Sequence, residues 1–156
     1  MGLGDLLSDE IKDKLISSVL DIGCVYRMKL TEEEGVTPKN EGDDSRKKYF
    51  IIVGFDNEGN AIGFLLINTN LRNEYAEEIL ALQYPLSHEK YDFLEGKSRY
   101  VDCSKIKSIK KEKFNSLFGG EKSHGVILEE DLELILDCVK NAPTITRKEL
   151  KKYGLL

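Results

Sequence analysis

The first 30 residues carry two successive hydrophobic patterns. Between residues 5 and 22, apolar side chains recur at every third or fourth position, which is the spacing of one face of an amphipathic helix; they are Leu7, Ile11, Leu15, Val19 and Ile22. Gly23 interrupts this pattern, and from residue 24 to 30 apolar side chains alternate as in a half-buried strand. We therefore expect a helix over 1–22 followed by a strand.

The middle of the chain predicts a β-hairpin. Residues 49–55 and 61–67 are two apolar runs rich in β-forming residues, and residues 56–60 between them favour a turn. Because both runs are almost continuously apolar, we expect both faces of the hairpin to be covered. The preceding residues 31–48 are densely charged and contain Pro38, so they predict a long loop.

The second half of the chain predicts several short elements. Residues 72–82 suit a short helix, and residues 84–86, 91–94, 100–103 and 106–109 suit strands at the spacing of a small barrel. Residues 128–142 have helical spacing and end at Pro143, after which Thr146 and Glu149 form a capping-box pattern that opens a C-terminal helix. We predict one mostly β domain (β+α) over 1–156, an SH3-like β-barrel with flanking N- and C-terminal helices.

Composition and charge narrow the class of protein. No apolar run approaches the roughly 20 residues of a membrane span, and no secretory signal opens the chain, so we expect a cytoplasmic protein. Three widely separated cysteines and two histidines predict neither a disulfide framework nor a metal site. The formal net charge of −5 is unevenly spread: six carboxylates fall between residues 31 and 44 and five lysines between 105 and 113. Each run is either a solvated face or, for the lysines, a phosphate-attracting one.

Polar segments flank the predicted hairpin. The loop ends in Arg46-Lys47-Lys48, and the second strand runs into Asn68-Thr69-Asn70. Because the start of the first strand lies beside the end of the second in an antiparallel hairpin, we expect Arg46 and Thr69 to be neighbours. An arginine beside a hydroxyl can hold a phosphodiester, and RNA supplies its own nucleophile, the 2′-hydroxyl. The alternative is that Arg46 pairs with loop carboxylates and Thr69 caps the following helix.

The segments follow one another in a recognisable order. A strand over 23–30, a polar loop, Arg46 entering an apolar strand, and a strand over 61–69 ending in threonine are followed by short strands over 101–109 and a helix from Leu128. This order resembles the PemK/MazF family of bacterial toxin endoribonucleases over 23–142, leaving 1–22 and 143–156 as helical extensions. The chain departs from the family pattern at Lys47, where proline is usual, at Asn70, where serine is commoner, and in its longer, more acidic loop.

The resemblance implies a PemK-type barrel that cuts single-stranded RNA without metal or cofactor, as a homodimer restrained by an antitoxin protein. It implies that Arg46 assists proton transfer and stabilises the phosphate, with Thr69 as its hydroxyl partner. The adjoining polar residues are the expected substrate-binding groups: Lys47, Lys48, Asn68 and Asn70. The loop carboxylates would repel RNA unless the loop swings away or pairs with nearby lysines.

Two other functions compete with this interpretation. The same barrel could be a non-catalytic module whose acidic loop and extra helices recruit a protein partner. A metal or small-molecule enzyme using His88 and His124 has no ligand spacing to support it. The aromatic residues of the middle segment could stack on unpaired bases, but at alternate strand positions they favour core packing; they are Tyr84, Tyr91, Phe93 and Tyr100.

Overall fold

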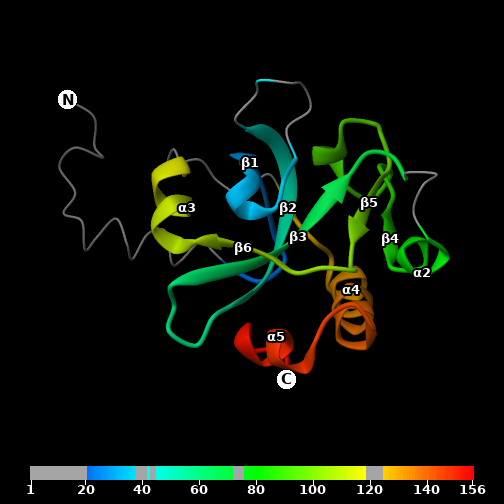
Figure 1. Cartoon of the computed structure of the whole chain (residues 1–156). Helices are drawn as coiled ribbons and strands as arrows, with labels where there is room; N and C mark the ends of the chain where they lie inside the picture. Colours follow the sequence, from blue (N-terminus) through cyan, green and yellow to red (C-terminus); the bar gives the residue numbers. More distant parts are fainter. Residues whose placement is uncertain (1–20, 38–41, 43–44, 72–75, 119–124) are drawn as a thin grey trace, which may run out of the picture.

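The computed structural model describes residues 21–37, 42, 45–71, 76–118 and 125–156 (Figure 1). The helix expected over 1–22 lies outside these residues, except for Asp21 and Ile22, which are not helical.

The described chain forms a curled antiparallel sheet. Its long strands β1 (Cys24–Leu30), β2 (Arg46–Phe55) and β3 (Ala61–Asn68) lie side by side, and shorter strands extend the sheet from both sides. The order is β4-β5-β3-β2-β1-β7, and β6 pairs with the first half of β3. The short strands are β4 (Gln83–Leu86), β5 (Arg99–Asp102), β6 (Lys107–Lys110) and β7 (Gly125–Val126). The sheet curls into an open half-barrel (Figure 1), which confirms the mostly β, barrel-like prediction.

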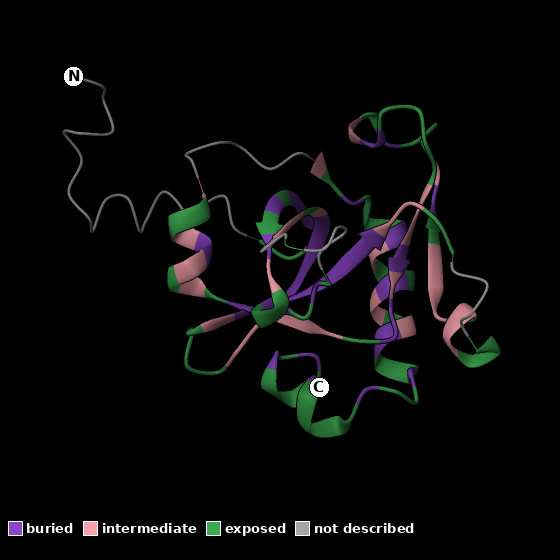
Figure 2. Ribbon diagram, turned by 45° about the horizontal axis from the view of Figure 1, so that its top comes forward, coloured by how far each residue is buried: buried purple, intermediate pink, exposed green. Residues whose placement is uncertain are grey.

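The hairpin was predicted correctly, and both of its faces are buried. Side chains of β2 and β3 alternate between two hydrophobic cores. The helix core contains Tyr49, Ile51 and Leu65 with Ile135 and Val139 of α4 (Glu129–Asn141). The Phe114 core lies on the other face and holds Phe50, Ile52, Phe64 and Phe114. Figure 2 shows the central strands coloured as buried along most of their length.

The helices agree with the prediction at the C-terminal end. Helix α4 matches the expected 128–142 within one residue at each end, and α5 (Arg147–Lys152) opens with both halves of the Thr146–Glu149 capping box. The expected helix over 72–82 is described only as α2 (Glu77–Leu80), and the chain then turns into β4.

One prediction between β4 and α4 was wrong, and one helix in this region was not predicted. Residues 91–94 are not a strand but the 3-10 helix η3 (Asp92–Leu94), which ends at Glu95 with φ 54°. The 3-10 turn buries Tyr91 and Leu94 together in the helix core. In a strand, two residues three positions apart would face opposite sides of the sheet. The lysine-rich stretch continues into the helix α3 (Lys111–Leu117), which buries Phe114.

The C-terminal extension packs closely against the hairpin. Leu150, Tyr153 and Leu155 join the helix core. A Cβ atom at Gly63 would lie 2.7 Å from the Tyr153 ring, and one at Gly54 would lie 2.2 Å from the Tyr153 carbonyl oxygen. The missing side chains of these two glycines therefore allow the extension to seat on β2 and β3.

Candidate nucleic-acid interface

The adjoining ends of β1, β2 and β3, at Leu30, Arg46 and Asn68, form the sheet edge that we call the rim. Strands β1 and β2 carry five cationic side chains, and none of β1, β2 or β3 contains Asp or Glu; the cations are Arg27, Lys29, Arg46, Lys47 and Lys48. Lys29 stands directly opposite Lys47 in the β1–β2 ladder. Like charges directly opposite destabilise a sheet. The rim therefore has a concentration of positive charge that folding does not require.

The predicted pair Arg46 and Thr69 lies at this rim. Arg46 pairs with Leu30 of β1, and Thr69 follows the last residue of β3. The β2–β3 ladder pairs Tyr49 with Ile67, and the same register continued outward sets Thr69 opposite Lys47 rather than Arg46. Both side chains are half-buried, and neither has a hydrogen bond or ion pair with another described residue. Their direct contact stays a prediction.

The alternative role of Thr69 as a helix cap is wrong for the helix that the structure describes. Helix α2 begins after Ala76, which has no side chain capable of capping.

Two of the predicted substrate-binding residues contact each other. Lys48 donates a hydrogen bond from Nζ to Asn68 Oδ1 at 2.6 Å, and both residues are half-buried. By strand alternation these residues face the side of the Phe114 core. Lys47 is exposed on the opposite face, and Asn70 is exposed beyond β3. The four predicted residues are thus divided between the two faces of the rim.

Sequence reasoning missed a cluster around Tyr49. The Arg27 guanidinium lies 5.3 Å and the Arg99 guanidinium 5.0 Å from the centroid of the Tyr49 ring. Arg27 and Lys29 could have been found from their alternation with apolar residues in the first strand. Arg99 could not, because only the pairing of β5 with β3 brings it near this face.

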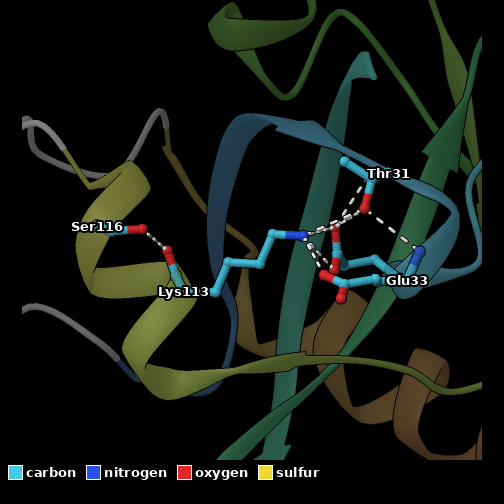
Figure 3. Close-up of polar contacts among 5 residues, drawn as sticks. Thr31, Glu33, Lys113 and Ser116 are labelled. Carbon is cyan, nitrogen blue, oxygen red and sulfur yellow. Dashed lines mark hydrogen bonds and ion pairs between the residues drawn. The ribbon is translucent and has the colours of Figure 1, made fainter. Parts of the chain in front are cut away.

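A lysine of α3 pairs with two of the three carboxylates in the described part of the acidic loop. Lys113 Nζ lies 2.8 Å from Glu33 Oε2, 2.8 Å from Glu34 Oε2 and 3.1 Å from Thr31 Oγ1 (Figure 3). The hydrogen bond from Lys113 lowers the pKa of Glu33. Burial lowers the pKa of Lys113, but the bonds to Glu33 and Glu34 outweigh it and the net shift is upward. Ser116 donates to the Lys113 carbonyl oxygen at 2.8 Å, within α3.

This arrangement bears on the expected repulsion of RNA by the loop. Thr31 and Glu34 form the capping box of the 3-10 helix η2 (Glu32–Glu34), and Lys107 Nζ donates to the Gly35 carbonyl oxygen at 2.9 Å. The sequence left two alternatives: the loop swings away, or it pairs with nearby lysines. The segment 31–35 follows the second, because Lys113 and Lys107 both contact it. The remaining loop carboxylates, Glu41, Asp43 and Asp44, lie outside the described residues.

The aromatic residues of the middle segment pack mainly into the core, as expected. Tyr91 is buried, and Tyr84 and Tyr91 both donate hydrogen bonds to the buried carboxylate of Asp131, Tyr84 at 2.6 Å. Burial raises the pKa of Asp131, but the tyrosine hydroxyls and Lys90 outweigh it and the net shift is downward. Burial and the bond to Asp131 raise the pKa of Tyr84 to about 12. The ionised Asp131 carboxylate, with the two neutral tyrosine hydroxyls that donate to it, anchors the start of α4.

The other candidate chemistry has little support from the geometry. His88 is exposed, with Nδ1 3.0 Å from Ser98 Oγ, and His124 lies outside the described residues. Within the described ranges, no three His, Cys, Asp or Glu side chains come together as metal ligands.

No described helix has the length and apolar character needed to cross a membrane. The chain matches no protein-family model and has no significant match among curated proteins.

Proposed function

We propose that this protein binds single-stranded RNA at the rim and cleaves it without a metal ion, as a PemK/MazF-like endoribonuclease. The observation that supports this best is the concentration of cations on β1 and β2, on strands without a carboxylate and beside the Thr69 hydroxyl. Phosphate contacts supply most of the affinity for nucleic acid that is independent of sequence. The ion pairs of Lys113 with Glu33 and Glu34 reduce the opposing charge nearby.

The proposed chemistry uses the substrate's own nucleophile. The 2′-hydroxyl oxygen attacks the adjacent phosphorus, the bond from phosphorus to the 5′-oxygen breaks, and a 2′,3′-cyclic phosphate and a 5′-hydroxyl end form. The proton of the 2′-hydroxyl passes to one water molecule, and a second water molecule gives a proton to the leaving 5′-oxygen. Arg46 donates hydrogen bonds to the non-bridging oxygens as negative charge builds on them, and Thr69 adds a hydroxyl donor. Lys47, Lys48, Asn68 and Asn70 hold the flanking nucleotides.

The proposal extends to the protein's partners and location. By the same resemblance, the protein acts in the cytoplasm as a homodimer and is restrained by an antitoxin protein.

A cleavage assay tests the proposed activity. Purified protein is incubated in EDTA with a mixed-sequence single-stranded RNA and, separately, with the all-deoxy strand of the same sequence. We expect the RNA alone to be cut, and Arg46→Ala to lower the rate by about 10²–10³-fold, the usual cost of removing one transition-state donor. Lys148→Ala on the exposed face of α5 is the matched control and should cut at the wild-type rate. Equal cleavage by Arg46→Ala, or cutting of the deoxy strand, would contradict the proposal.

The second candidate is a non-catalytic module that binds a protein partner. The observation favouring it is the outer face of α4, where Leu128 and Leu134 are 45% and 55% exposed. A shallow hollow of about 410 Å³ there is lined by Leu128, Glu129, Glu130 and Glu133. An apolar surface ringed by carboxylates suits a basic amphipathic partner. Absence of RNA binding even at low ionic strength would favour this candidate.

A further inference from the structure

We propose that Arg27, Lys29 and Arg99, gathered around Tyr49 on the helix-core face of the sheet, form a subsite that binds the phosphates of single-stranded RNA. We call these four residues the Tyr49 subsite. The inference rests on the proposed RNA substrate but not on cleavage, and none of the four residues belongs to the proposed catalytic pair.

The sheet brings the three cations to one face. Arg27 is the direct partner of Tyr49 in the β1–β2 ladder, and paired residues project to the same side. Lys29 is two residues further along β1, so it shares that face. Arg99 is two residues before Val101, which pairs with Ile67, the partner of Tyr49 on β3. Three strands thus converge on the same ring.

The positive charge of this face has no acidic partner in the described parts of the chain. The two guanidinium groups lie 5.3 Å and 5.0 Å from the centroid of one ring, and Lys29 faces Lys47 across the ladder. Within the described ranges, no ion pair is made by the three cations of the subsite or by Lys47. The Nε atom of Arg99 is also buried without a hydrogen-bond partner among the described residues. A buried donor left unpaired is unfavourable. Within the described chain no carboxylate competes for these cations, and Arg27 and Lys29 are exposed to an incoming anion.

The chemistry of the cluster favours a phosphodiester backbone over a base. Arginine binds phosphate through two parallel hydrogen bonds, and guanidinium groups held over an aromatic ring are oriented before the ligand arrives. The Tyr49 ring is only 5% exposed, so it orients the arginines and is not a stacking platform for bases. Each guanidinium lies about 5 Å from the centroid of the Tyr49 ring, so the two groups are at most about 10 Å apart and can bind one phosphate or two adjacent ones, while Lys29 lies further along β1.

A binding assay with an uncleavable ligand tests the subsite separately from catalysis. The probe is a fluorescently labelled, fully 2′-O-methylated single-stranded RNA, and anisotropy gives the dissociation constant at several salt concentrations. The variant carries Arg27→Gln, Lys29→Gln and Arg99→Gln. The matched control carries Lys140→Gln, Lys148→Gln and Lys151→Gln, which remove the same charge from exposed positions on α4 and α5. Circular dichroism checks that both remain folded.

We expect the subsite variant to bind at least tenfold more weakly at low salt, while the control binds within about twofold of wild type. Each lost phosphate contact should reduce the slope of log affinity against log salt by about 0.7, so the slope should fall by about two. An unchanged slope and affinity in the subsite variant, or an equal loss in the control, would overturn the subsite even if RNA is cleaved. Tight binding by Arg46→Ala that remains sensitive to the subsite variant would support the subsite even if cleavage is never observed.

Discussion

The buried carboxylate of Asp131 offers the sharpest test of how the fold is held together. Asp131 lies in the first turn of α4 and is 6% exposed. It accepts hydrogen bonds from two tyrosine hydroxyls. Tyr84 lies in β4, and Tyr91 is the residue directly before η3. The Tyr91 hydroxyl also accepts a bond from the Leu128 amide at 3.1 Å, at the start of α4. Replacing each tyrosine with phenylalanine removes these bonds and leaves the ring in place.

The structure predicts an order for the two substitutions. Tyr84→Phe removes one hydrogen bond to a charged group, which lowers the free energy of unfolding by about 1.5–3 kcal/mol. Tyr91→Phe removes an equivalent bond and also leaves the Leu128 amide unpaired, which adds about 1 kcal/mol. Tyr91→Phe should therefore be the more destabilising. Tyr100→Phe is the control, because the half-buried Tyr100 has no hydroxyl hydrogen bond to a described residue.

The effect should also depend on pH. The pKa of Asp131 is lowered in the folded state, so its contribution to stability is full above the ordinary aspartate pKa of about 3.9 and is lost as pH falls through the folded-state value. Urea denaturation followed by circular dichroism measures the free energy of unfolding of each variant from pH 7 down to pH 3. Losses below about 0.5 kcal/mol at pH 7, or a larger loss for Tyr84→Phe than for Tyr91→Phe, would refute the reasoning.

Three further substitutions test the packing of the loop and the C-terminal extension. Gly63→Ala should lower the free energy of unfolding by about 1–3 kcal/mol in urea denaturation, because its Cβ atom overpacks the Tyr153 ring. Lys113→Met should cost about 2 kcal/mol, since Glu34 is buried while Lys113 is partly exposed; a thermal melt measures it. Thr146→Ala should cost about 1 kcal/mol and increase amide hydrogen exchange in α5, because it removes the capping box.

Each of these expectations has an outcome that would contradict it. Wild-type stability for Gly63→Ala would show that the extension shifts without cost. Equal effects of Lys113→Met and of Lys110→Met, an exposed lysine, would show that the loop contacts add nothing. Unchanged exchange in α5 after Thr146→Ala would show that tertiary packing, rather than the cap, holds this helix.

Local patterns predicted the elements whose residues agree with one another. β1, the hairpin, α4 and the α5 cap all appear close to their predicted places, because their periodicity, turn residues and caps favour the same structure. The failures are short segments where burial of single side chains decides the conformation. Asp92–Leu94 form a 3-10 helix that buries Leu94 together with the preceding Tyr91, and α3 packs Phe114 into the core within a lysine run.

For the candidate site, the sequence indicated the hairpin ends but not the surface they join. Strand order decides that Arg99, which follows Tyr49 by 50 positions, lies over the same ring as Arg27, and no local pattern encodes that order. Strand alternation likewise separates Lys47 from Lys48 by face, although they are adjacent in the chain.

The sequence alone determined the β character, the hairpin, the helical termination at Pro143 and the uneven charge, since each depends on neighbours within a few residues. Only the tertiary structure decided which charges are neutralised and which are not. Lys113 meets Glu33 and Glu34 across about 80 residues, whereas Arg27, Lys29 and Arg99 meet no carboxylate in the described chain. The physical reason is that Coulomb interactions depend on distance in space, and the sheet sets that distance through pairings between remote segments.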